Sequence, residues 1–240
     1  MADVMHQFEI KKITPIKIEG YDISFTNSSL CMVITVVFVT TLLAYCLRKK
    51  TLIPGFAQSF AEYIYEYVYN ILYSNVGKEA VHYMSFLFTL FLFVLVGNIL
   101  GLFPYSFTFT SHFAVVGCLS IIGLLFNIYN GLKKRKLGYF RTFLPKGVPL
   151  WLSPLIIPIE TLSLLSKSFS LTVRLVMNMI IGHIVLKVFA GFIIMMKILG
   201  FVPLFFSGAI IVFELFIACL QAYIYTVLSC IYLSDALHEH

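Results

Sequence analysis

Residues Pro154 to Ala190 read PLIIPIETLSLLSKSFSLTVRLVMNMIIGHIVLKVFA and set the architecture expected for this chain. Near the middle stands Arg174, with apolar sequence for several turns on both sides. A guanidinium at the centre of a bilayer helix costs about 2.5–3.5 kcal/mol by insertion scales, and its pKa above about 12 keeps it charged. The alternative interpretation is an arginine that snorkels to the membrane surface. The long apolar flanks favour a functional cation inside a membrane protein.

Composition places the chain among polytopic membrane proteins. Of its 240 residues 60% are hydrophobic and 12% are charged, against about 25% charged in soluble domains, and the mean hydropathy is +0.95. The net charge of +6 comes from short basic clusters between apolar runs. Such clusters are typical of loops on the inner side of a membrane and argue against a nucleic-acid partner. The five cysteines lie in apolar runs without metal-ligand spacing, so we expect small buried hydrophobes and no metal site.

Three apolar runs of ordinary length each predict one membrane helix: Leu30–Leu47, Phe86–Phe103 and Phe113–Tyr129. Arg48-Lys49-Lys50 follows the first run and Lys133-Lys134-Arg135-Lys136 follows the third. Both basic clusters are expected on the inner side of the membrane. The N-terminal segment 1–29, which has no signal-peptide core, then lies on the opposite, proton-rich side. An odd number of spans is needed to bring the C-terminus inside.

The remaining apolar segments predict an interfacial helix and a long hairpin. Pro54–Tyr73 has an apolar side and a polar side, as in a helix that lies in the membrane interface. Pro154–Ala190 and Pro203–Leu233 each exceed thirty residues, about 45 Å of helix against a hydrocarbon core of about 30 Å. Joined by Gly191–Gly200, they predict a strongly tilted antiparallel hairpin.

The expected fold is therefore an all-α polytopic membrane protein with about five membrane helices and one interfacial helix. It forms a single membrane domain over residues 1–240. Residues 30–147 hold the first three spans and the interfacial helix, and residues 148–240 hold the tilted hairpin with the proton path.

Six polar residues lie on one face of the first hairpin helix. At 100° per residue they fall in a stripe about 80° wide along nearly five turns: Glu160, Ser163, Lys167, Ser170, Arg174 and Asn178. Serines alone would fit polar contacts between neighbouring helices. Three charged side chains on one face favour a functional stripe instead.

Polar residues of the two hairpin helices also match across the turn. Antiparallel neighbours have residue numbers with a constant sum, and three pairs share one axis near residue 198: Arg174 with Gln221, His183 with Glu214, and Glu160 with Asp235. The sequence thus predicts Gln221 beside Arg174 and the His183–Glu214 pair about 13 Å nearer the turn. His183 lies half a turn around the helix from the stripe, so this pair is expected to line a separate wet path.

These groups can do different chemistry. Histidine and glutamate exchange protons near neutral pH, whereas arginine does not. No acid of the chain lies at the depth and on the face of Arg174, so we expect another chain to provide its carboxylate. Such an acid would lose its proton beside Arg174 and regain one away from it. Two half-paths around a fixed cation then force protons through a moving carrier.

The motifs that carry these residues closely resemble one family. They are Ser170-Leu171-Thr172-Val173-Arg174-Leu175 with Asn178 and Gly182-His183, Leu220-Gln221-Ala222-Tyr223, and Asn98-Ile99-Leu100-Gly101-Leu102-Phe103-Pro104 with the loop Tyr105 to His112. Over most of the chain they resemble subunit a of F-type ATP synthases. Met177 stands where that family usually has a small residue.

The resemblance implies proton translocation through two offset half-channels, coupled to ATP synthesis by a rotating ring of c subunits. Arg174 would face the ring carboxylates. Asn178, His183, Glu214 and Gln221 would belong to the inlet half-channel or its junction with the ring, and Glu160, with Asp235 as a weaker candidate, to the outlet. The implied partners are the c ring, b-type peripheral stalk subunits, the rest of the ATP synthase and the lipid bilayer.

The same resemblance implies a non-catalytic, proton-coupled subunit with no cofactor and no nucleotide site, in a bacterial inner membrane or, alternatively, a mitochondrial inner membrane. A self-contained proton channel or secondary transporter is the main alternative, and a purely structural subunit is a third. A channel would conduct protons as a purified chain in liposomes; the wall of a half-channel without its partner would not.

Overall fold

The computed structural model describes residues 10–15, 17–18, 21–22, 24–48, 51, 53–103, 106–136 and 152–237. Lys49 and Lys50 of the first basic cluster, and Pro104 and Tyr105 of the motif region, lie outside the described residues.

The described chain is mainly helical. It contains α1 (Asn27–Cys46), α2 (Phe56–Val76), α3 (Ala80–Gly101), α4 (Phe113–Arg135), α5 (Ser153–Met196) and α6 (Phe201–Leu237), with short 3-10 turns η2 (Gly77–Glu79), η3 (Phe109–Ser111) and η6 (Lys197–Gly200). Before α1, two small antiparallel ladders pair β1 (Lys12–Thr14) with β4 (Phe25–Thr26) and β2 (Lys17–Ile18) with β3 (Tyr21–Asp22). These ladders were not expected from the sequence.

Five of the described helices, all except α2, are long and apolar enough to cross a membrane, which confirms the predicted number. Three boundaries differ from the prediction by six residues: α3 begins at Ala80 rather than at Phe86, α4 ends at Arg135 rather than at Tyr129, and α5 ends at Met196 rather than at Ala190. His82 and Ser85 interrupt the apolar run in the sequence, but neither residue breaks a helix. In α2, Val68 and Leu72 are buried while Glu62 and Glu66 are exposed, as an amphipathic helix requires. Phe56, predicted on the apolar side, is exposed at the start of the helix.

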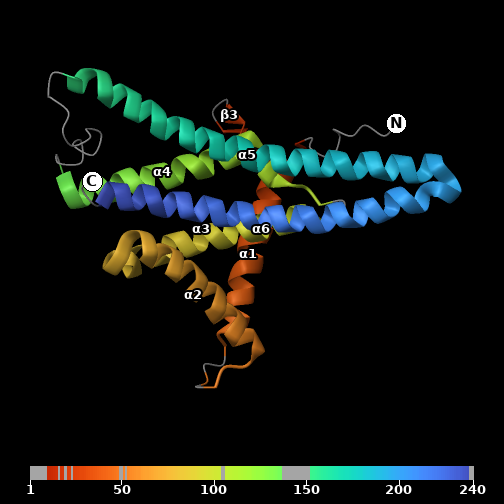
Figure 1. Cartoon of the computed structure of the whole chain (residues 1–240), viewed down its shortest axis with the longest axis horizontal. Helices are drawn as coiled ribbons and strands as arrows, with labels where there is room; N and C mark the ends of the chain where they lie inside the picture. The colour runs from red at the N-terminus through yellow and green to blue at the C-terminus, as the bar shows by residue number, and fades with distance from the viewer. Residues whose placement is uncertain are drawn as a thin grey trace.

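The last two helices form the predicted hairpin. They have 44 and 37 residues, or about 66 and 55 Å, and η6 joins them where the residue sums placed the axis. In Figure 1 they run side by side from the turn to the middle of the molecule, cross α1 steeply, and separate toward the start of α5. Each is about twice as long as the hydrocarbon core is thick, so it can remain in a bilayer only when strongly tilted.

The third helix is the most enclosed of the five. Half of the residues in the most apolar 18-residue stretch of α3 are buried, against 11% of those in the corresponding stretch of α5. Two glycines on α3 let the η3 loop approach its backbone: an added Cβ would lie 2.5 Å from Phe109 Cζ at Gly97 and 2.7 Å from Thr108 Cγ2 at Gly101. Small residues one turn apart thus seat the loop against the helix.

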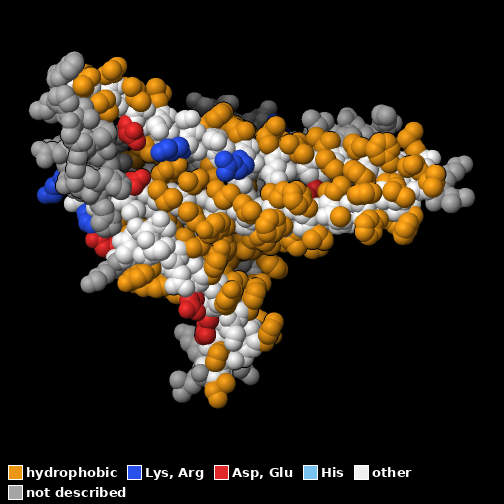
Figure 2. Space-filling model, in the orientation of Figure 1, with side chains coloured by type: hydrophobic (Ala, Val, Ile, Leu, Met, Phe, Trp, Pro, Cys, Tyr) orange, Lys and Arg blue, Asp and Glu red, His pale blue; other side chains and the backbone are white. Residues whose placement is uncertain are grey.

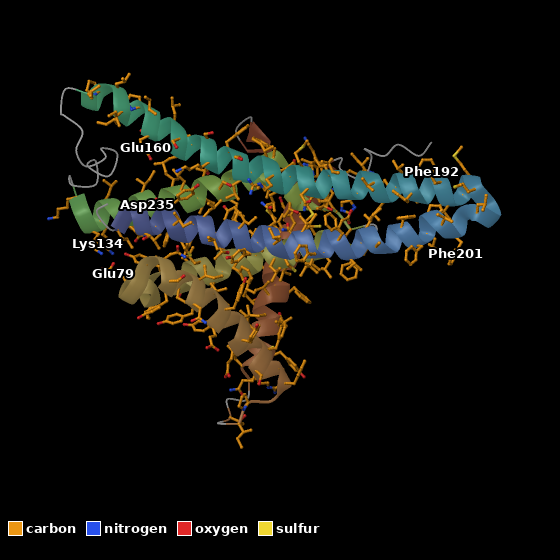
Figure 3. All side chains as sticks on the ribbon, in the orientation of Figure 1. Glu79, Lys134, Glu160, Phe192, Phe201 and Asp235 are labelled. Atoms are coloured by element: carbon orange, nitrogen blue, oxygen red, sulfur yellow. The ribbon has the colours of Figure 1, made fainter. Side chains whose placement is uncertain are left out.

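The bundle has two distinct ends. At the basic end, Lys134 of α4 pairs with Glu79 of η2, and Ser234 Oγ of α6 donates to the Asn75 carbonyl of α2 at 2.7 Å. Figure 3 shows Glu79 and Lys134 at this end and the hairpin turn at the other extreme of the molecule. At the loop end, residues 106–112 connect α3 to α4, and the start of α1 contacts η3.

Candidate functional site

Arg174 lies on the exposed side of α5. Leu171 and Leu175 on the opposite side of the same turns are buried, while Lys167 and Ser170 share the exposed side with the arginine. Within the described residues, the guanidinium makes no hydrogen bond and no ion pair. Figure 2 shows basic side chains over α5 on a face that is otherwise largely apolar. The predicted polar stripe is therefore a surface feature, and its central cation has no counter-ion among the described residues.

A polar contact inside the bundle fixes the buried side of α5 at this level. Thr172 Oγ1 donates to Ser120 Oγ of α4 at 2.9 Å, and both side chains are buried. This contact between α5 and α4, which the sequence did not predict, orients the turn of α5 that projects Arg174 outward.

His183 is buried and faces the loop end. Its Nε2 lies 3.0 Å from Thr108 Oγ1, and the Thr108 hydroxyl donates to the Gly101 carbonyl at 3.1 Å. Thr108 is 75 residues away in sequence and belongs to the loop before η3. No periodic pattern links such distant positions, so sequence reasoning included this loop in the resemblance but missed the contact.

Glu214 is buried against α5 beside His183. An added Cβ at Gly182 would lie 2.7 Å from Glu214 Cδ and 3.2 Å from Cγ, so the missing side chain of Gly182 makes room for the carboxyl group. The sum of 182 and 214 agrees with the predicted hairpin axis. Both carboxyl oxygens are buried without a hydrogen bond to any described residue, so Glu214 and His183 are adjacent but not hydrogen-bonded.

Two buried amide side chains lie near Glu214, on the side away from the hairpin turn. Gln221 lies on the buried side of α6, two turns from Glu214, and its Nε2 has no partner among the described residues. Asn98 of α3 is also buried, and its Nδ2 donates to the Ala218 carbonyl at 3.5 Å. By hairpin register Gln221 is level with Arg174, but it faces the bundle interior, and no hydrogen bond joins the two within the described residues. Asn178, one turn after Arg174, is half-buried.

The other members of the stripe lie toward the basic end. Glu160 on α5 and Asp235 on α6 are both half-buried, and Figure 3 shows them on the two helices at the same end of the molecule. Between them and Arg174, the Lys167 ammonium lies over the Tyr232 ring, 5.9 Å from its centroid. Sequence reasoning missed Tyr232, although the sum of 167 and 232 is close to the hairpin constant.

These features define a class. Within the described residues, a multi-pass membrane protein presents Arg174 without a counter-ion on an exposed helix face, with His183 and Glu214 toward the loop end and Glu160 and Asp235 toward the basic end. Titratable groups on both sides of a fixed cation are typical of a membrane subunit that carries ions together with a partner. Among the described residues, no cluster of His, Cys, Asp and Glu could hold a metal ion.

Comparison with known proteins agrees with this class. The family profile described as "ATP synthase A chain" matches residues 29–234. The chain is 48% identical to the ATP synthase subunit a of Rhodospirillum rubrum over the full length of both proteins. It is 47% identical to that of Mesorhizobium japonicum, covering 99% of this chain and 97% of the relative.

The chain thus belongs to the family of ATP synthase subunits a, the proton-conducting stator subunits of F-type ATP synthases. It is a multi-pass membrane protein and a subunit of that complex.

Proposed function

We propose that this chain carries protons through two offset half-channels that meet at Arg174, where carboxyl groups of a rotating c ring pick protons up and release them. The exposed, unpaired guanidinium of Arg174 is the observation that carries the proposal. A fixed cation at membrane depth needs an anion, and the described residues provide none.

The inlet half-channel would begin at the loop end. His183 and Glu214 are proton-exchanging groups on the loop-end side of Arg174, and both are buried, as a path closed to lipid requires. Gln221 and Asn98 extend the polar line inward to the level of Arg174. Buried polar atoms without protein partners, such as the Glu214 oxygens, are the groups that bind water in a conducting path. Asn178 would lie at the junction with the ring.

The outlet half-channel would lie at the basic end, which the positive-inside rule places on the inner side. Glu160 and Asp235 are its candidate proton acceptors, and both are half-buried. Because the two sets of acids occupy opposite ends of the bundle, a proton that enters by one cannot reach the other without passing Arg174.

The role of Arg174 follows from its charge. A ring carboxylate that passes within a few ångströms of a guanidinium is stabilised in its ionised form and releases its proton toward the outlet. After it has passed Arg174, the carboxylate takes a proton from the inlet, because the lipid that it enters next favours the protonated form. Each proton that moves down 100 mV supplies about 2.3 kcal/mol for rotation.

The partners and the membrane follow from the same proposal. The exposed side of α5 would face the c ring, and b-type peripheral stalk subunits would hold the chain stationary. Similar ATP synthase subunits a come from bacteria such as Rhodospirillum rubrum and Wolbachia, which favours a bacterial inner membrane over a mitochondrial one.

The test replaces Arg174 in the assembled ATP synthase and measures inverted membrane vesicles. Arg174→Ala should abolish ATP synthesis and ATP-driven proton pumping, and should allow passive proton leak once the catalytic head is removed. Lys167→Ala is the matched control, because it removes the neighbouring exposed cation of the same stripe. Normal pumping in Arg174→Ala, or an equal leak in Lys167→Ala, would refute the assignment.

A further inference from the structure

The loop before η3 contributes a side chain to the histidine of the inlet. Thr108 is almost fully buried, with 1% of its surface exposed, and its hydroxyl oxygen lies 3.0 Å from His183 Nε2 and 3.1 Å from the Gly101 carbonyl oxygen. Three segments therefore meet here: the end of α3, the loop, and α5.

The two contacts of Thr108 favour one arrangement of the protons. The Gly101 carbonyl can only accept, and the threonine hydroxyl has a single proton to donate. When the Thr108 hydroxyl donates its proton to a hydrogen bond with the Gly101 carbonyl, Thr108 Oγ1 can accept a hydrogen bond from His183 Nε2. In this arrangement the ring nitrogen that faces Thr108, Nε2, carries a proton.

We propose that Thr108 is a positioning residue for proton transfer: by its hydrogen bond with His183 Nε2 it holds the imidazole ring in the orientation that proton exchange requires. This inference deepens the proposed inlet and rests on His183 being part of it. The hydrogen bond that a histidine makes through one ring nitrogen fixes the orientation of the ring and decides which nitrogen carries the proton.

Gly101 of α3 leaves the space that Thr108 occupies. A Cβ at Gly101 would lie 2.7 Å from Thr108 Cγ2, so glycine is the residue that lets the threonine reach both the carbonyl and the ring. The next threonine of the loop serves as a comparison. Thr110 is equally buried, but its Oγ1 has no hydrogen-bond partner among the described residues.

The experiment measures passive proton conduction and ATP-driven pumping per assembled complex in membrane vesicles. Thr108→Val, which keeps the shape and removes the hydroxyl, should lower both by about 2- to 10-fold, the usual worth of one hydrogen bond. Thr108→Ser, which keeps the hydroxyl, should restore conduction. Thr108→Ala is a second hydroxyl-free variant that separates the hydrogen bond from any packing effect of valine. Thr110→Val removes an unpaired hydroxyl from the same loop and should conduct normally.

A double-mutant cycle tests whether the effect passes through the histidine. If Thr108 acts by positioning His183, Thr108→Val should add nothing in a His183→Ala background. Conduction equal to the unmodified complex in Thr108→Val, or a full additional loss in the double variant, would overturn the proposal. A His183→Ala variant that conducts normally would overturn the proposed inlet itself, a result distinct from a failure of Thr108 alone.

Discussion

Adding one methyl group at Gly182 should move the Glu214 carboxyl group away from His183. The Cβ of Gly182→Ala would lie 2.7 Å from Glu214 Cδ and closer still to Oε1, and real Cβ atoms do not approach a neighbour so closely. The carboxyl group must therefore rotate away or the two hairpin helices must move apart. Overpacking of this kind costs about 1–3 kcal/mol.

This clash should lower proton conduction more than it lowers assembly of the complex. If the proton passes only when Glu214 occupies its native place, a cost of about 1–3 kcal/mol lowers the conducting fraction by about 5- to 150-fold. The assay is passive proton permeability of inverted vesicles after removal of the catalytic head, together with ATP-driven pumping, both normalised to the amount of assembled complex.

The matched control is Gly191→Ala on the same helix. No atom lies within 4 Å of a Cβ built at Gly191, so this variant gains helix propensity without a clash. It should conduct normally. Adding Glu214→Asp to Gly182→Ala shortens the acid by one methylene and should recover part of the loss. Equal conduction by Gly182→Ala and Gly191→Ala would refute the close packing of Glu214 on Gly182.

Two further predictions use other contacts. Exchanging His183 and Glu214 should retain more proton pumping than replacing either one alone, because the two positions are adjacent across the hairpin; an exchange no better than the single replacements would contradict a shared site. Thr172→Val removes the 2.9 Å hydrogen bond to Ser120 and should lower the stability of the purified complex against heat by about 0.5–1.5 kcal/mol, whereas Thr161→Val, whose hydroxyl bonds only its own helix, should change little; equal melting curves would show that the buried bond contributes nothing.

Much of the architecture could be predicted because it depends on short-range patterns. Apolar runs of about 20 residues give membrane helices wherever they occur. The hairpin axis followed from polar residues with a constant sum, and the contact of Gly182 with Glu214 agrees with it. The helical wheel likewise predicted the stripe of Lys167, Ser170 and Arg174, all exposed on one face of α5.

Other features escaped prediction for a physical reason. The direction of Gln221 depends on how α6 rotates against α3 and α4, and a wheel drawn for one helix pair does not contain that rotation. The short strand ladders before α1 are two or three residues long, too short for an alternating pattern to be read. The contact of Lys167 with the Tyr232 ring joins a charge to an aromatic side chain, so a comparison restricted to polar residues passed over it.

The residues alone determined the membrane class, the number of helices, the hairpin and the isolated cation, because hydropathy, helix period and charge act over a few turns of one chain. The tertiary structure decided which side of each helix faces inward, and therefore that Arg174 is exposed while His183 and Glu214 are buried. It also brought Thr108 to His183 through the glycine seat on α3. Such contacts arise only when whole helices pack, since the residues that make them are far apart along the chain.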